Sequence, residues 1–205
     1  MCGRFVLLAD LSAVTAEFHI RDIEYPLLTG ADIRPGQEVS AIVGGPGHRL
    51  TAFSWGLLPS WAKDRTLGRK LINARAETVA VKPSFRTSFA KRRCLIVADG
   101  FYEWSSSGGG RRPWLLRLKN GAPFGLAALY DHWRSPGGEL IASCTIITTT
   151  PNEIVAPIHN RMPVIIPGTC AAAWLDPANR NEAGLLALLK PYPPGDMEGL
   201  PAPTA

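Results

Sequence analysis

The sequence has no apolar run that approaches the roughly 20 residues of a membrane-spanning helix, so we expect no membrane partner. Its N-terminus does not combine basic residues, an apolar core and a small-residue cleavage site, so we predict no secretory signal. Only four cysteines are present, at positions 2, 94, 144 and 170, and none forms a C-x-x-C pair. We therefore expect no metal, no cofactor and no disulfide framework, and a reducing, cytoplasmic location.

A strong excess of charge is also lacking. The formal net charge is +5, which suits a nucleic-acid partner but also many proteins without one. The 205 residues, 46% of them hydrophobic, are enough for one domain with a sizeable core. Because the chain contains no internal repeat or clear linker, we predict a single domain over residues 1–190. A proline-rich tail, extended or disordered, is expected over residues 191–205.

Short apolar segments bounded by glycine and proline predict many strands and a few helices. Asp10 can cap a helix over residues 11–19 that places Leu11, Val14 and Phe18 on one face. Strands are predicted over residues 39–43, 50–55, 94–98, 114–118, 124–133, 143–149 and 162–166. Further helices are predicted over residues 83–90, 152–159, 171–174 and 181–189. Because strands and helices do not alternate regularly, we expect an α+β fold with a curved, mostly antiparallel, barrel-like sheet and short flanking helices.

Position 2 carries a cysteine directly after the initiator methionine. A small second residue permits removal of Met1, which leaves Cys2 with a free α-amine beside its thiol, both partly nucleophilic near neutral pH. Such a 1,2-aminothiol attacks an aldehyde with its amine, loses water to form a Schiff base, and closes through sulfur to a thiazolidine. An internal cysteine cannot do this, because its nitrogen belongs to an amide. The alternative is an incidental cysteine near a frayed terminus.

Two polar side chains follow the apolar pair at residues 71–72. Asn73 and Arg75 belong to the segment Asn-Ala-Arg-Ala-Glu-Thr, and they could hold a backbone phosphate or orient a reacting group. The alternative is the start of a helix, with Asn73 as its cap and Arg75 on the solvated face.

A carboxyl group lies between aromatic residues just after an apolar strand ends at an Asp-Gly pair. Glu103 stands between Tyr102 and Trp104. Aromatic surroundings raise the pKa of a carboxyl group into the range of a general acid or base. The alternative is a surface glutamate on an edge strand.

A histidine at the end of an expected helix precedes an arginine. His159 and Arg161 belong to the segment Ile-His-Asn-Arg-Met-Pro at residues 158–163. Such a histidine can act as an acid or base near neutral pH, and the alternative is a purely structural polar contact.

Four segments, in this order, closely resemble the SOS-response-associated peptidase (SRAP) family. They read Met-Cys-Gly-Arg (1–4), Asn-Ala-Arg-Ala-Glu-Thr (73–78), Arg-Cys-Leu with Asp-Gly-Phe-Tyr-Glu-Trp (93–104) and Ile-His-Asn-Arg-Met-Pro (158–163). The resemblance extends from Cys2 to about Asp176. Members of this family are sensors of abasic sites. The resemblance therefore implies an SRAP-type fold, and single-stranded DNA containing an abasic site as the partner.

The resemblance implies four catalytic positions. Cys2 would form the thiazolidine with the ring-opened abasic aldehyde, and Asn73 would position the sugar. Glu103 would assist proton transfer during Schiff-base formation and ring opening. His159 would act on the deoxyribose oxygens, including during reversal of the crosslink.

The resemblance also implies a set of DNA contacts. Arginines would bind the phosphates beside the lesion, and tryptophans would stack on or wedge against the neighbouring bases, a combination that binds single strands without reading their sequence. These DNA-binding residues are Gly3, Arg4, Trp61, Arg75, Arg86, Trp104 and Arg161. The other tryptophans (Trp55, Trp114, Trp133 and Trp174) are expected in the core.

The sequence departs from the family pattern before its second predicted strand. Asp32 stands where members commonly carry asparagine, and Arg34 stands where they carry alanine, so Arg34 is expected to add a phosphate contact. We expect a monomer that is cytoplasmic and nucleoid-associated when bound to DNA.

Three functions remain open on the sequence. The first is a sensor that crosslinks to DNA with lyase-like, self-reversing chemistry, its peptidase activity being limited to autoproteolytic exposure of Cys2. The second is a thiol autopeptidase or amidohydrolase that uses Cys2, His159 and Glu103. The third is a non-catalytic module that binds single strands.

Overall fold

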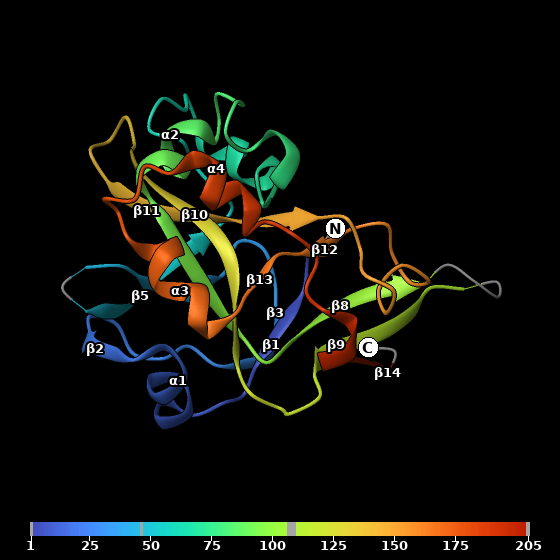
Figure 1. The fold of residues 1–205 in the computed structure, drawn as a ribbon. Coiled ribbons are helices and arrows are strands. Elements are labelled where there is room, and N and C mark those ends of the chain that lie inside the picture. Colours follow the sequence, from blue (N-terminus) through green and yellow to red (C-terminus); the bar gives the residue numbers. More distant parts are fainter. Residues whose placement is uncertain (1, 46, 106–109, 204–205) are drawn as a thin grey trace.

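The strands form two sheets in the computed structural model, which describes residues 2–45, 47–105 and 110–203 (Figure 1). Within these ranges the five-stranded sheet has the order β14 (Met197–Pro201), β9 (Arg112–Leu118), β8 (Gly100–Ser105), β1 (Phe5–Leu7) and β3 (Gly30–Ile33). The nine-stranded sheet has the order β12 (Met162–Pro163), β11 (Leu140–Thr149), β10 (Phe124–Arg134), β7 (Arg93–Ala98), β4 (Glu38–Val43), β5 (His48–Trp55) and β2 (Ile20–Ile23). To this sheet β13 (Ile165–Ile166) adds beside β10, and β6 (Asn73–Arg75) adds beside β11.

The larger sheet closes on itself. Strands β11, β10, β7, β4 and β5 pair in turn as antiparallel neighbours, and β5 then returns to β11 in a parallel pairing. This ring of strands is a barrel, and its inward side chains form the main core. The expected α+β fold with a mostly antiparallel, barrel-like sheet is therefore confirmed.

The longer strands were predictable, and the short ones were not. β4, β5, β7, β9, β10 and β11 lie where strands were expected, and the predicted strand over residues 162–166 is divided into β12 and β13. The sequence did not indicate β1, β2, β3, β6 or β14 as strands, and it offered a strand at β8 only as the alternative for Glu103. β2 and β3 each span four residues, and each buries only one of them, so they offer no apolar alternation to detect. Of the tryptophans expected in the core, Trp55, Trp133 and Trp174 are buried and Trp114 is half-buried.

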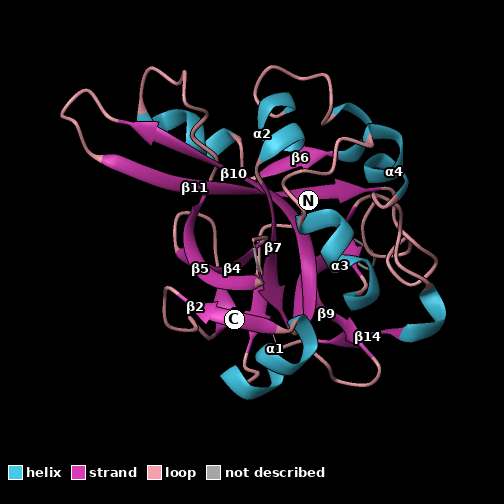
Figure 2. Cartoon of the chain, turned by 60° about the vertical axis from the view of Figure 1, so that its left-hand side comes forward, coloured by secondary structure: helices cyan, strands magenta, loops and turns pink. Residues whose placement is uncertain are grey.

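Short helices lie around the outside of the strands (Figure 2). They are α1 (Leu11–Phe18), α2 (Arg86–Lys91), α3 (Gly168–Leu175) and α4 (Glu182–Ala187), with 3-10 helices η1 (Arg65–Lys70), η2 (Ala76–Thr78) and η3 (Pro194–Asp196). The Asp10 carboxylate accepts from the Ala13 N–H and caps α1 as expected, and the helix buries Val14 and Phe18. In the described ranges no helix is long and apolar enough to cross a membrane.

The helix predicted over residues 152–159 is wrong. This segment is a series of turns, in which the Asn152 side chain accepts from the N–H groups of Ile154 and Val155. Pro157 has no N–H to donate to a preceding turn, which opposes a continuous helix. Because of these turns, His159 lies in the segment just before β12 and not on the face of a helix.

The chain leaves the barrel at Asp99, between the end of β7 at Ala98 and the start of β8 at Gly100. The Asp99 carboxylate accepts from the backbone N–H groups of Leu8 and Ala9, just after β1. A Cβ at Gly100 would lie 2.8 Å from the Leu115 side chain and 3.0 Å from the Leu116 carbonyl oxygen, so this crossing needs glycine. The step lays β8 beside β1 and fixes the position of Glu103 relative to the N-terminal segment.

The proline-rich segment at residues 191–205 is extended in part, but it is not separate from the domain. β14 pairs antiparallel with β9 over its whole length, and Met197 is fully buried. The Ala202 N–H donates to the Pro113 carbonyl at 2.9 Å. Residues 197–202 therefore complete the smaller sheet.

Replacing Met197 tests this pairing. Met197→Ala should lower the free energy of unfolding by about 2–5 kcal/mol, because it removes a buried side chain and leaves a cavity. Leu200→Ala, on the same strand but 36% exposed, should cost much less. Urea unfolding of both variants measures the difference, and equal small effects would show that β14 contributes little to stability.

Candidate functional site

The four predicted catalytic residues come from both sheets. Cys2 directly precedes β1, and Glu103 lies on β8 beside it. Asn73 begins β6, and His159 ends the turns that lead into β12. Figure 1 shows β8 and β12 approaching each other near the N-terminal end of the chain. The candidate site therefore lies where the barrel meets the smaller sheet.

Cys2 is fully buried and belongs to the main core, so it is not a frayed terminal residue. Burial raises the pKa of its thiol, and the nearby Glu103 carboxylate raises it further. The thiol therefore keeps its proton at neutral pH unless a base removes it. A cysteine peptidase needs the opposite surroundings, which lower the thiol pKa.

Glu103 is not a surface residue on an edge strand. Its side chain is 3% exposed, and β8 lies between β1 and β9. Burial raises the pKa of its carboxyl group, while His159 and Arg111 act against this shift. A carboxyl group in this environment can carry a proton at a pH at which an exposed glutamate cannot, as a general acid must.

His159 faces Glu103. Its Nε2 lies 4.0 Å from Glu103 Oε2. On the other side of the ring, Nδ1 accepts from the Arg161 N–H at 3.0 Å, and the Arg161 carbonyl oxygen lies 3.1 Å away. In the neutral ring that accepts this N–H, the proton sits on Nε2 and points toward Glu103. The two predicted acid–base residues are therefore brought together.

Asn73 presents an amide oxygen that no described residue satisfies. Its Nδ2 donates to the Ile72 carbonyl at 3.0 Å, while its buried Oδ1 has no hydrogen-bond partner within the described ranges. Asn73 lies on strand β6 and does not cap a helix, so the helix alternative is wrong. A buried polar atom left without a partner favours a role in contacting a ligand.

Two guanidinium groups lie near the ring of Trp104. Arg4 is 5.1 Å and Arg111 is 5.5 Å from the ring centroid. Arg4 also pairs with Asp32 at 2.8 Å, and Asp32 in turn holds Arg34. The sequence did not identify Arg111 as a candidate DNA contact, because it is simply one of two arginines that follow a run of glycines. The pairing of β8 with β9 shows the signal, since it places Arg111 over the Trp104 ring.

The remaining predicted DNA contacts differ in their surroundings. Gly3 is half-buried next to Cys2, and Arg75 is exposed just after Asn73. Arg161 instead makes a bidentate ion pair with Glu77. Trp61 is 56% exposed. Arg86 begins α2, and in the described ranges neither it nor Trp61 makes a hydrogen bond or ion pair with the other candidates.

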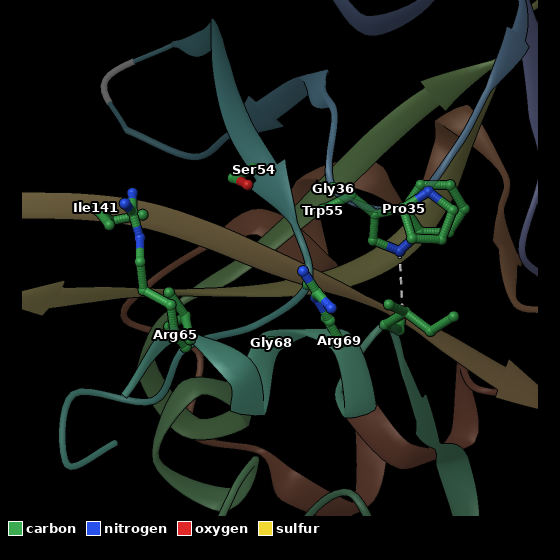
Figure 3. Close-up of a pocket in the computed structure, with 11 residues that line it drawn as sticks. Pro35, Gly36, Ser54, Trp55, Arg65, Gly68, Arg69 and Ile141 are labelled. Carbon is green, nitrogen blue, oxygen red and sulfur yellow. Dashed lines mark hydrogen bonds between the residues drawn. The ribbon is translucent and has the colours of Figure 1, made fainter. Parts of the chain in front are cut away.

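A cavity of about 480 Å³ adjoins the site between β5, η1 and β11. Figure 3 shows Arg65 and Arg69 from η1 reaching toward it, opposite Pro35 and Trp55. The Trp55 ring lies 5.3 Å from Phe5, and its Nε1 donates to the Ile72 carbonyl next to Asn73. No residue predicted from the sequence as catalytic or DNA-binding lines this cavity. Among the described residues, no group of three His, Cys, Asp or Glu side chains could hold a metal ion.

Comparison with known proteins assigns the chain to a family. The family model described as "SOS response associated peptidase (SRAP)" matches residues 1–205. The chain belongs to the SRAP family. It is 42% identical over 202 residues to the abasic site processing protein YoqW of Bacillus subtilis, covering 97% of this chain and 90% of that protein.

Further SRAP relatives agree. The abasic site processing protein YoaM of Bacillus subtilis is 42% identical over 204 residues, covering 97% of this chain and 89% of YoaM. A crystal structure of a protein from Bacteroides thetaiotaomicron superposes with a TM-score of 0.88 at 28% identity, covering 97% of this chain and 90% of that one. The fold described above is therefore the fold of this family.

The raised pKa of Glu103 predicts how stability depends on pH. The folded protein holds the Glu103 proton more tightly than the unfolded chain, so the resulting stabilisation is present below the ordinary pKa of glutamate. It is lost as the pH rises through the folded-state pKa. Glu103→Gln should therefore gain stability relative to wild type as the pH rises above the ordinary pKa of glutamate, about 4.3. Glu153→Gln, at an exposed position, serves as the control, and a flat difference in urea unfolding would contradict the assignment.

Proposed function

We propose that the protein recognises abasic sites in single-stranded DNA and bonds covalently to them through Cys2 after Met1 is removed. The observation that carries the proposal is the burial of Cys2 beside Glu103, which in turn faces His159 at 4.0 Å. The names of YoqW and YoaM as abasic site processing proteins support the choice of substrate.

In the proposed reaction the Cys2 amine attacks the C1′ aldehyde of the ring-opened sugar and forms a carbinolamine. Glu103, holding a proton because of its burial, gives it to the departing hydroxyl, and water leaves as the Schiff base forms. The resulting carboxylate takes the proton of the Cys2 thiol while sulfur adds to the C=N carbon. Amine, aldehyde and thiol thus become a thiazolidine and one water, without an oxidant or reductant.

The other candidate residues would contact the sugar, the phosphates and the neighbouring base. Asn73 Oδ1, which lacks a protein partner within the described ranges, would accept from a sugar hydroxyl. His159 Nε2 would exchange a proton with the deoxyribose oxygens during ring opening and reversal. Arg4, Arg75 and Arg111 would bind phosphates, with Trp104 providing a face on which a base can stack.

Blocking the N-terminus separates this proposal from the thiol peptidase. A tag ahead of Cys2 turns its amine into an amide, which is not nucleophilic, so the tagged protein should bind abasic DNA but give no heat-stable adduct. Cys2→Ala should behave likewise, whereas Cys170→Ala should crosslink normally. Denaturing gels and intact mass measure the adduct. Full crosslinking by a protein whose tag is still in place would rule out the thiazolidine.

The acid–base pair can be tested by rates. Glu103→Gln and His159→Ala should slow the chemistry by about 10²–10⁴-fold, the usual contribution of a positioned acid or base. We expect Glu103→Gln to slow crosslink formation more, and His159→Ala to slow reversal more. Single-turnover time courses measure both steps, with Glu153→Gln as the control. Wild-type rates in both variants would refute these roles.

A further inference from the structure

The guanidinium of Arg161 is anchored on two sides. Its Nη1 donates to Glu77 Oε1 at 2.6 Å and its Nη2 to Glu77 Oε2 at 3.0 Å, a bidentate pair. Nη2 also donates to the Thr148 carbonyl at 2.6 Å. Only 16% of the Arg161 side chain is exposed. Both terminal nitrogens of Arg161 therefore already donate hydrogen bonds to protein acceptors.

The backbone of the same residue contacts the ring of His159. The Arg161 N–H donates to Nδ1 at 3.0 Å, and the Arg161 carbonyl oxygen lies 3.1 Å from that atom. These contacts favour the ring orientation in which Nε2 is directed at Glu103. Anything that fixes Arg161 therefore also fixes the direction of the His159 ring.

Glu77 connects this unit to the strand that carries Asn73. It lies in η2, directly after β6, and β6 pairs in parallel with β11, where Ile146 is opposite Asn73 and Thr148 is opposite Arg75. The Thr148 hydroxyl donates to the Ala74 carbonyl at 3.3 Å. The ion pair thus closes a ring of contacts through β6, β11 and the segment before β12. Hydrogen bonding to Arg161 lowers the pKa of Glu77, so the carboxylate persists to acid pH.

We propose that Glu77 is a positioning residue for His159, acting through the guanidinium and backbone of Arg161. The role rests on the proposed function, in which His159 exchanges protons with the sugar. In this role Glu77 acts through Arg161 and not by direct contact with the reacting atoms. The arrangement also gives the two arginines different roles. The charge of Arg161 is neutralised by Glu77, whereas Arg75 is exposed and is left to bind phosphate.

The decisive comparison is between two Arg–Glu pairs. Glu77→Ala removes the pair on Arg161, and Glu198→Ala removes the 2.8 Å pair with Arg117 on β9, away from His159. In ¹⁵N NMR titrations of the histidine side chains, Glu77→Ala should change the tautomer ratio and the titration curve of His159. Glu198→Ala should leave both unchanged. This readout needs no DNA, so it tests the positioning role even if wild-type protein forms no crosslink.

Crosslinking rates give the second readout. Glu77→Ala should slow the His159-dependent reversal by up to about 100-fold, the cost of misplacing a reacting group, while affinity for a tetrahydrofuran abasic analogue does not fall. Arg161→Lys should act similarly, because an ammonium group cannot bridge both Glu77 oxygens. The double variant should be no slower than either single one. Glu77→Gln, which keeps one acceptor oxygen, should be intermediate.

Two results would overturn the proposal. One is an unchanged His159 titration in Glu77→Ala together with a wild-type reversal rate. The other is an equal loss in Glu77→Ala and Glu198→Ala that follows their loss of thermal stability, which would make the pair merely structural. Absence of a crosslink in wild-type protein would instead refute the proposed function, leaving the titration result to decide the role of Glu77.

Discussion

The pairing of β11 with strands along both of its edges is the constraint on which the rest of the structure depends. Along one edge β11 pairs with β10 and then with β12, and along the other edge it pairs with β5 and then with β6. The contact with β5 closes the barrel. The contacts with β6 and β12 bring the neighbourhoods of Asn73 and His159, 86 residues apart in sequence, to one end of the same strand. A one-residue slip of β6 or β12 against β11 would move the side chains of that strand to the opposite face of the sheet.

The smaller sheet contributes the other two residues of the site, Cys2 and Glu103, and both are buried. Cys2 and Glu103 share an environment in which the protonated form of each is favoured, since burial raises both pKa values. A proton can move between the two groups at a low cost in free energy, because burial disfavours the charged form of both. The guanidinium groups of Arg4 and Arg111 around Trp104 keep positive charge at the margin of this region.

The sequence was most informative where the chemistry is local. The cap at Asp10, the long barrel strands and the residue types at positions 2, 73, 103 and 159 could all be recognised from neighbouring residues. Contacts between segments that are distant in the sequence could not be recognised in this way. The burial of Cys2, the stacking of Arg111 on Trp104 and the Glu77–Arg161 pair each depend on strand pairings that no local pattern encodes. The turns over residues 152–159 depend on Pro157 and on the Asn152 side chain, which caps the backbone locally in place of a helix.

The docking of β14 on β9 has a consequence for how the protein can be handled. β14 occupies the outer edge of β9, whose backbone groups would otherwise be open to pairing with another chain. Shortening the protein before Met197 would turn β9 into an unprotected edge rich in leucine and invite self-association. The boundary for truncation or fusion therefore lies beyond Ala202, whose N–H still bonds to Pro113.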